Sequence, residues 1–524
     1  MSDVRIDEHG IGVGSLAAEM VAREPRARRD HARLMQRDAA LWPAPPETTA
    51  PWLGWLDSLE RAPAHVRHIR SVVHDLSGDD FRHVVLVGMG GSSLFPLVLA
   101  GLWPSGAATP RLHVLDSTDP AAVASVEEDV DWASTLVVAA SKSGTTIETL
   151  AHLDRFAARL LDACGEEARR RIVVVTDPGG PLEQRAADAG FRAVISGDSD
   201  VGGRYSALSP FGLLPAELLA IDTDTLLGAA RAAEAGWNAD PWADTGPAYL
   251  ATFLAAGVAA GRDALVLLVD PRLGDFGAWI EQLVAESSGK DGTGLLPVVL
   301  RSAREVAALD RAIAVTIGDV AGLSASRVKN MPTVHIPWQG NERLGVEVLR
   351  WMQAVALACA QLGVNPFDQP DVAAAKAATA DALTAGTEPE PAVAWSGIEH
   401  ALAGAAYLAV LAYVHPERGR TDRLSEAAQR LSRSYGIPVT VGIGPRYLHS
   451  TGQLHKGGRE DGVFLMVVGE DERDVEIPGR PYGFSRLKRA QAAGDLAALR
   501  ASGRRAFVVH EHELVEDDHE DGRT

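Results

Sequence analysis

Short apolar segments alternate with amphipathic segments over most of the chain after about residue 80. The first series has strand-like segments at 83–87, 112–115, 135–140, 172–176 and 193–196. A second series has strand-like segments at 264–269, 295–300, 312–317 and 333–337, with helical patterns at 276–287 and 344–362. Strands that alternate with helices form mostly parallel sheets covered on both faces. The pattern therefore predicts an α/β protein with two such units.

The segments on either side of these series have other patterns. Residues 1–75 are polar and predicted to be helical, and residues 386–510 begin with predicted helices at 396–414 and 422–435, followed by strand-like segments at 439–442, 463–468 and 506–510. The uncharged stretches 245–261 and 401–414 are expected to be buried helices rather than membrane spans. The acidic segment 387–391 is a candidate linker, and residues 511–524 are expected to form an acidic, disordered tail.

Charge and cysteine content exclude several classes of function. The chain has 50 Lys and Arg against 70 Asp and Glu, a net charge of −20, so we expect no nucleic acid or membrane partner. An anionic ligand would need a local binding site. Cys164 and Cys359 are the only cysteines and form no CxxC motif, which argues against a zinc site or a disulfide framework. The N-terminus lacks a signal-peptide pattern, and we expect a cytoplasmic protein.

A glycine-rich loop, Gly88–Ser93 (GMGGSS), lies between a predicted strand and a predicted helix. Glycines allow close approach of the backbone to a ligand, and the helix N-terminus favours an anion such as phosphate. A dinucleotide is less consistent with this loop, because the GxGxxG pattern would need glycine where Ser93 stands. An ordinary tight turn remains the alternative.

A second such loop, Ser141–Thr149 (SKSGTTIET), is rich in hydrogen-bond donors. Hydroxyl or ammonium groups belong to Ser141, Lys142, Ser143, Thr145, Thr146 and Thr149. Clustered hydroxyls at a helix N-terminus can bind the oxygens of a phosphate. Helix capping is the alternative, but it would need only one or two such residues. The GxxxxGK[ST] pattern is absent, which disfavours ATP hydrolysis.

Glu286 stands near the end of the helical segment that precedes Ser-Ser-Gly-Lys290. A carboxylate near the negative end of a helix dipole is electrostatically unfavourable, which suits a general base. The alternative is an exposed surface Glu beside a glycine that ends the helix.

Five segments together resemble the glucose-6-phosphate isomerase family. They are GMGGSS, SKSGTTIET, GGRYS (202–206), AESSGK (285–290) and FDQPDVAAAK (367–376). The resemblance implies two sugar-isomerase (SIS) domains of the flavodoxin-like αβα sandwich type. We place them at 76–240 and 241–385, with a helical extension at 1–75 and a mixed extension at 386–510 that packs on the second domain. Segments 33–42, 442–458 and 477–484 resemble the isomerase half of transaldolase–isomerase fusion proteins.

The resemblance implies interconversion of glucose 6-phosphate and fructose 6-phosphate without metal or cofactor, by a homodimer. Gly91, Ser92, Ser141, Lys142, Ser143, Thr145 and Thr146 would bind the phosphate, and Gln369 would contact a sugar hydroxyl. Glu286 would move the proton between the two carbons, Arg204 would stabilise the enediolate, and Lys376 would help to open the sugar ring.

The family commonly has a ring-opening histidine between the Glu and Lys motifs, often delivered by the partner subunit. Here that interval contains His335, in a strand-like segment where a core role is expected. The alternatives are His449 and His455, in a loop rich in glycine and hydroxyls. The sequence does not decide which group opens the ring. Two other functions compete with this one. The chain could be an isomerase of another sugar phosphate (mannose or amino-sugar phosphate), or a non-catalytic regulator that binds a sugar phosphate. An amino-sugar synthase would need an N-terminal nucleophilic cysteine, and no cysteine precedes Cys164.

Overall fold

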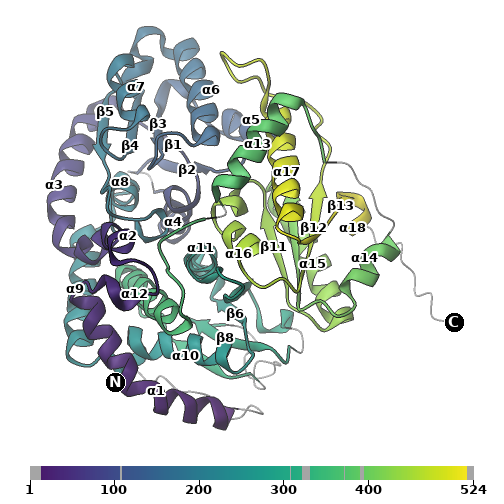
Figure 1. The fold of residues 1–524 in the computed structure, drawn as a ribbon. Coiled ribbons are helices and arrows are strands. Elements are labelled where there is room, and N and C mark those ends of the chain that lie inside the picture. Colours follow the sequence, from purple (N-terminus) through teal and green to yellow (C-terminus); the bar gives the residue numbers. More distant parts are fainter. Residues whose placement is uncertain are drawn as a thin grey trace.

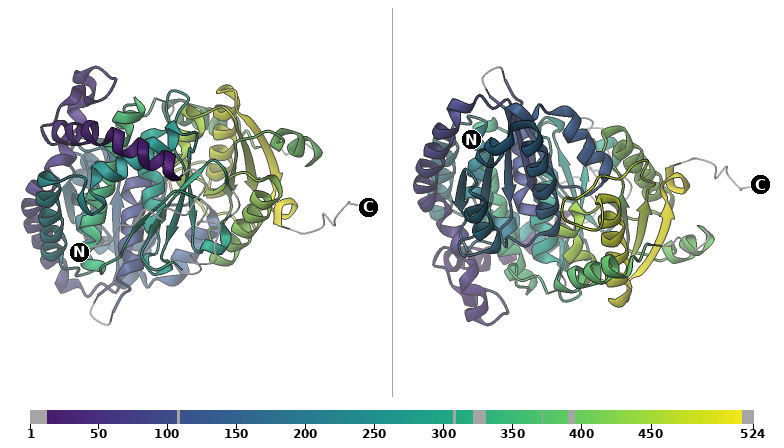
Figure 2. Two further views of the ribbon diagram at one scale, coloured as in Figure 1. Left: turned by 90° about the horizontal axis from the view of Figure 1, so that it is seen from below. Right: turned by 90° about the horizontal axis from the view of Figure 1, so that it is seen from above.

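The computed structural model of the chain describes residues 13–106, 109–306, 309–320, 331–370, 372–389 and 395–515. Three β-sheets lie side by side, with helices packed around them (Figure 1). The C-terminal sheet, in green and yellow, lies beside the other two in both of the further views (Figure 2). Within the described residues, no helix is both long enough and apolar enough to cross a membrane.

The first sheet has the strand order β2-β1-β3-β4-β5, and all its neighbours are parallel. Its strands are β1 (His83–Gly88), β2 (Arg111–Leu115), β3 (Thr135–Ala140), β4 (Ile172–Thr176) and β5 (Ala193–Ser196). The helices between them are α4 (Leu94–Leu102), α5 (Pro120–Asp129), α6 (Ile147–Cys164) and α7 (Pro181–Ala189). This is the flavodoxin-like order, which places a crevice between the carboxyl ends of β1 and β3. The predicted parallel α/β arrangement is confirmed.

The second sheet repeats this winding in the order β7-β6-β8-β9. Its strands are β6 (Ala264–Val269), β7 (Leu296–Leu300), β8 (Ala312–Ile317) and β9 (Thr333–Ile336). Its helices are α10 (Pro247–Ala259), α11 (Phe276–Ser288) and α12 (Leu344–Leu362). The prediction of a buried helix within 245–261 is confirmed by α10, in which most side chains are buried.

A third parallel sheet, in the order β11-β10-β12-β13, was not predicted as such. Its strands are β10 (Tyr407–Tyr413), β11 (Val439–Ile443), β12 (Gly462–Val468) and β13 (Arg505–His510). The prediction of one helix over 396–414 was wrong, because α14 (Trp395–Leu402) ends and β10 follows. All residues of β10 are buried. A central strand covered on both faces reads as a continuous apolar run, without the alternation that would mark it as a strand.

The helices around the third sheet are α13 (Val372–Ala385), α15 (Arg418–Tyr435), α16 (Gly452–Gly457), α17 (Phe484–Ala501) and α18 (Glu511–Val515). The expected disordered tail therefore begins as a helix: Leu514 packs into the core and Glu511 pairs with Arg420 at 2.6 Å. The rest of that tail, and part of the expected linker at 387–391, lie outside the described residues.

Helices α1 (Val13–Met35), α2 (Pro46–Thr49) and α3 (Ser58–Leu76) form the N-terminal part, as predicted, and α8 (Pro210–Leu218) and α9 (Thr223–Ala239) connect the first two sheets. One continuous apolar core joins these helices to both sheets, and it contains Trp55, Leu86, Leu267 and Trp351. The first two sheets are therefore held together by buried apolar surface, which fixes the loops at their carboxyl ends relative to one another.

The C-terminal part packs on both sheets rather than on the second alone. Tyr413 and Phe464 share a core with Leu296 of the second sheet, while Ile477 and Phe484 join the core on one face of the first sheet. The C-terminal part thus shares apolar cores with both of the other sheets.

Candidate active site

Three loops approach one another closely at the carboxyl ends of the sheets. They are the loop after β1, the 3₁₀ turn Gly203–Tyr205 and the 3₁₀ turn Arg446–His449. A Cβ at Gly91 would lie 1.9 Å from the carbonyl oxygen of Gly203, so only glycine allows this approach. Gly90 has φ +57°, and a Cβ there would lie 2.7 Å from the carbonyl oxygen of His449. The glycines of GMGGSS therefore serve contact between loops as well as any contact with a ligand.

The hydroxyl-rich loop precedes α6 as predicted, but its side chains do not cap the helix. Ser141 Oγ donates to Thr146 Oγ1 at 3.0 Å, and the hydroxyls of Ser143 and Thr145 are 2.9 Å apart. Thr146 is the N-cap residue of α6, yet within the described residues its side chain makes no capping hydrogen bond. Thr146 therefore leaves the N-terminus of α6 without the side-chain cap that the capping alternative requires.

Lys142 lies beside this loop with its charge already paired. Its ammonium group forms an ion pair with Asp177 and donates to the carbonyl oxygen of Asp198 at 2.9 Å. Burial raises the pKa of Asp177, and the hydrogen bond from Lys142 opposes that rise. Lys142 therefore holds the base of the loop and adds little free positive charge.

Glu286 lies two residues before the end of α11, and its side chain is only 9% exposed. Its Oε1 is 3.0 Å from Arg204 Nη1, and Gln282 Nε2 donates to its Oε2 at 3.0 Å. The amide of Gln369 also donates to Oε1. The structure thus brings together the predicted base, the predicted cation and the predicted polar contact, and it excludes the alternative of an exposed surface Glu.

Arg204 is 2% exposed and is itself fixed by several contacts. Its Nε donates to Ser287 Oγ at 3.0 Å, and its Nη2 donates to the carbonyl oxygen of Pro366. The guanidinium therefore links α11 to the loop that precedes α13. Lys376 lies in α13, but its side chain lies outside the described part of the structure.

Of the two candidate histidines, His449 belongs to this cluster. Its Nε2 is 3.0 Å from Glu148 Oε1 in the first turn of α6, and its carbonyl oxygen accepts from Gln282 Nε2 at 2.8 Å. Burial would raise the pKa of Glu148, but His449, a backbone hydrogen bond and the nearby His152 together hold that pKa below its usual value. Gln491 Nε2 donates to the same Glu148 oxygen at 2.7 Å.

His455 is not brought to the site. Its ring is 1% exposed and packs against Phe464 and Tyr447, with ring centroids 5.3 Å and 6.2 Å away. Burial, with Lys456 and Arg504 nearby, lowers the pKa of His455 to about 3. It is a neutral core histidine. His335 is a half-buried residue of β9 that lies 2.8 Å from Thr316 Oγ1, in agreement with a core role.

Glu148, Gln282 and Gln491 also belong to this cluster, although they were not predicted from the sequence. Two of them carried a local signal: Glu148 lies inside the hydroxyl-rich segment in the first turn of α6, and Gln282 precedes Glu286 by one helical turn, where side chains meet. Gln491 carried none, because it reaches Glu148 across 343 residues of sequence.

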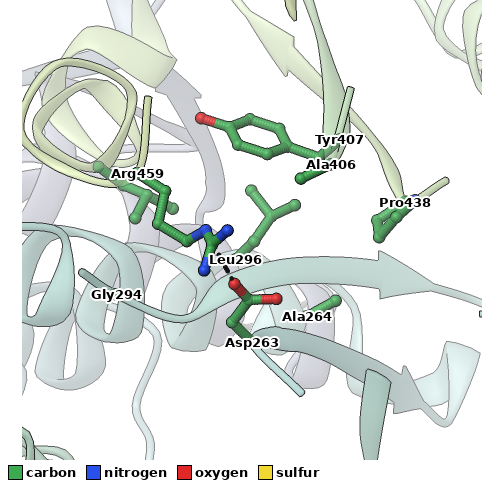
Figure 3. Close-up of a pocket in the computed structure, with 9 residues that line it drawn as sticks. Asp263, Ala264, Gly294, Leu296, Ala406, Tyr407, Pro438 and Arg459 are labelled. Carbon is green, nitrogen blue, oxygen red and sulfur yellow. Dashed lines mark ion pairs between the residues drawn. The ribbon is translucent and has the colours of Figure 1, made fainter. Parts of the chain in front are cut away.

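A separate pocket lies between the second and third sheets, and Figure 3 shows it lined by Asp263, Ala264, Tyr407 and Arg459, among others. Ala264 and Tyr407 begin β6 and β10, so this pocket lies at the amino ends of the strands. Its Asp263 and Arg459 form an ion pair at 3.1 Å, and none of the sequence-predicted site residues lines it. Within the described residues, no three His, Cys, Asp or Glu side chains are grouped to hold a metal ion.

Fold and site together define a parallel α/β protein in which the first turn of α6 and a buried carboxylate–guanidinium pair are linked through Glu148, His449 and Gln282. Residues 58–296 match the family model for phosphoglucose isomerase. The resemblance inferred from the sequence is confirmed over this segment, which contains Arg204, Glu286 and both loops. Gln369, Lys376 and His449 lie beyond it.

Individual relatives are named glucose-6-phosphate isomerase. The chain is 34% identical over 252 residues to a glucose-6-phosphate isomerase of Rubrobacter xylanophilus, covering 46% of this chain and 57% of that protein. It is 37% identical over 241 residues to one of Thermus thermophilus, covering 45% and 56%. The alignments thus span little more than half the length of these relatives. The crystal structure of a glucose-6-phosphate isomerase from Chlamydia trachomatis has the same fold, with a TM-score of 0.54 at 18% identity over 71% of this chain and 86% of that one.

Proposed function

We propose that this chain interconverts glucose 6-phosphate and fructose 6-phosphate by proton transfer through an enediolate. The observation that carries the proposal is the buried Glu286, held by Arg204, Gln282 and Gln369 in the region where the glycine loop meets the other two loops. A carboxylate fixed on one side by a guanidinium can act as a base while the cation offsets charge on the substrate.

Each step of the reaction has a side chain suited to it. The phosphate binds at the N-terminus of α6, where Ser141, Ser143, Thr145 and Thr146 present hydroxyls. Once the ring is open, Glu286 takes the proton from C2 and returns it to C1, while a hydroxyl proton moves between O1 and O2. Arg204 offsets the negative charge of the enediolate between these steps. Binding of the remote phosphate fixes the reacting carbons against the base.

Ring opening falls to His449 rather than His455, because His449 faces the crevice and His455 is enclosed in the core. We keep Lys376 as a second group for this step from the resemblance alone. Gln369 contacts the base directly, so it would orient Glu286 as well as contact a sugar hydroxyl.

The test is turnover by the purified chain in the presence of EDTA. We expect the wild type to equilibrate the two hexose phosphates, and Glu286→Gln to lower the rate by about 10²–10⁴ or more without loss of structure. The matched control is Glu60→Gln, an exposed position in α3 that we expect to leave activity unchanged. Binding of glucose 6-phosphate without turnover would indicate a regulator instead. Preference for mannose 6-phosphate or an amino-sugar phosphate would redirect the substrate assignment.

A further inference from the structure

We propose that the ring-opening histidine acts within its own chain, because the C-terminal part brings His449 to the base and to the start of α6. This inference rests on the proposed function and adds to it the source of the ring-opening group. The family resemblance implies a histidine that the partner subunit often delivers. In this structure His449 contacts Glu148 of its own chain, and its carbonyl oxygen accepts from Gln282, which also donates to the base Glu286.

The turn that carries His449 is fixed to the first sheet by an ion pair. Arg446 Nε and Nη2 contact the two carboxylate oxygens of Asp116 at 2.8 Å and 2.7 Å, and Asp116 follows the carboxyl end of β2. A paired contact of this kind constrains direction as well as distance. With the bond from Gln282 to the carbonyl oxygen of His449, it holds the backbone of the turn against both the first sheet and α11.

The imidazole itself has a defined orientation. Its Nε2 is held by Glu148, and Glu148 in turn accepts from Gln491, whose side-chain oxygen accepts from Thr118 Oγ1 at 2.6 Å. Since Nε2 is engaged, Nδ1 is the ring nitrogen available to a bound sugar. The side chain is 20% exposed, enough for a ligand to reach it. A carboxylate hydrogen-bonded to the ring fixes its orientation, as in other His–carboxylate pairs.

The same turn is also anchored beneath the site. Tyr447 Oη donates to Asp495 Oδ2 at 2.6 Å, and Lys456 pairs with the other oxygen of Asp495 at 2.6 Å. Asp495 is 1% exposed, so breaking these bonds would leave a buried charge unpaired. Together with the apolar core shared by the second and third sheets, they hold the C-terminal sheet against the second sheet.

The chemical step assigned to His449 balances without a further reactant. The C1–O5 bond of the pyranose breaks as the imidazolium donates its proton to O5, and the O1 hydroxyl releases a proton to water as the aldehyde forms. Water then returns a proton to the imidazole. Ring closure reverses these transfers, so the same residue interconverts the α and β anomers without any transfer at C2.

Anomer exchange therefore separates the roles of the two residues. We expect Glu286→Gln to lose isomerisation but to retain catalysed exchange between the anomers of glucose 6-phosphate, measured by exchange NMR. We expect His449→Gln to slow that exchange by about 10²–10⁴. Glutamine keeps a donor for Glu148, so this variant is designed to fold. The matched control is His400→Ala, an exposed residue of α14, which we expect to behave as wild type. Undiminished exchange in His449→Gln would overturn the assignment.

Mixing the two variants tests whether the histidine acts within its own chain. Glu286→Gln and His449→Gln chains with different affinity tags are co-expressed, and any mixed oligomer is purified through both tags. If His449 serves its own chain, each site lacks one group and isomerisation stays absent. Restored isomerisation would show delivery from a partner and reject the proposal. If the wild-type chain is monomeric in solution, its activity as a monomer supports the proposal directly. Absence of activity in the wild type would instead reject the proposed function.

Discussion

Lys290 provides a pH-dependent test of how the site is held together. It follows α11 and is 3% exposed, and its ammonium group pairs with Asp368 Oδ1 at 2.7 Å and donates to the carbonyl oxygen of Asn365. These contacts fasten the loop that carries Gln369, which reaches Glu286. Burial, with Arg204 nearby, lowers the pKa of Lys290 from 10.5 to about 8.

The sign of the effect on stability follows from the protons bound in each state. Between about pH 8 and 10.5 the unfolded chain keeps this proton while the folded chain has lost it, so the contribution of Lys290 to the free energy of unfolding rises with pH. At about 1.4 kcal/mol per pH unit, the gain from pH 8 to 9.5 is about 2 kcal/mol. Urea unfolding of wild type and Lys290→Met at pH 7.5, 8.5 and 9.5 gives this contribution as a difference. A difference that stays flat across this range would refute the reasoning.

Activity is expected to change in the opposite direction. A neutral Lys290 no longer pairs with Asp368, and the loop that orients Gln369 against Glu286 is released. We expect kcat/KM to fall above about pH 8. Lys290→Arg keeps a charge at these pH values, so its alkaline limb is expected to move to higher pH. An unmoved limb would assign it to another group.

Three further substitutions test other parts of the structure. Ser141→Ala removes a hydroxyl from the anion loop, and we expect KM for glucose 6-phosphate to rise about 10- to 100-fold with kcat nearly unchanged. His455→Leu is expected to keep activity in steady-state assays. It is also expected to lose less stability in acid, because the wild-type unfolded chain binds a proton near pH 6.5 that the folded His455 accepts only near 3. Lys488→Met leaves Asp119 and Asp471 without their shared buried partner, and we expect a loss of about 3–5 kcal/mol in urea unfolding.

Local pattern was sufficient to predict the parts of the site that lie directly after strands. The loops after β1 and β3 carry glycines or hydroxyls between an apolar run and a helix, and the parallel order of adjacent strands then places them at one edge. Glu286 was predictable for a similar reason, since its position at the end of a helix follows from the pattern of α11 alone. Its exposure was not, because burial depends on Arg204 and on the loop before α13.

Contacts between distant segments could not be predicted in this way. His449 meets Glu148 across 301 residues, and nothing in the loop LHSTGQLHK separates His449 from His455 before the third sheet is in place. The short helix α16 turns His455 inward toward Phe464, while His449 remains on the preceding turn at the crevice. The strand β10 was mistaken for a helix for the same reason. Its apolar run reflects packing on both faces, and the local sequence does not show which segments pack there.

The distribution of charge around α6 shows how a chain with a net charge of −20 can hold an anion. Lys142 is paired with Asp177 and Arg204 with Glu286, so each of these cations is already offset by a carboxylate. In the proposed function, the attraction for a phosphate then comes from hydroxyls and backbone N–H groups at the positive end of the helix dipole. Such donors recognise an anion by the spacing of its oxygens more than by its charge. In the proposed function, ligand choice therefore depends on the geometry of residues 141–146 rather than on the net charge of the chain.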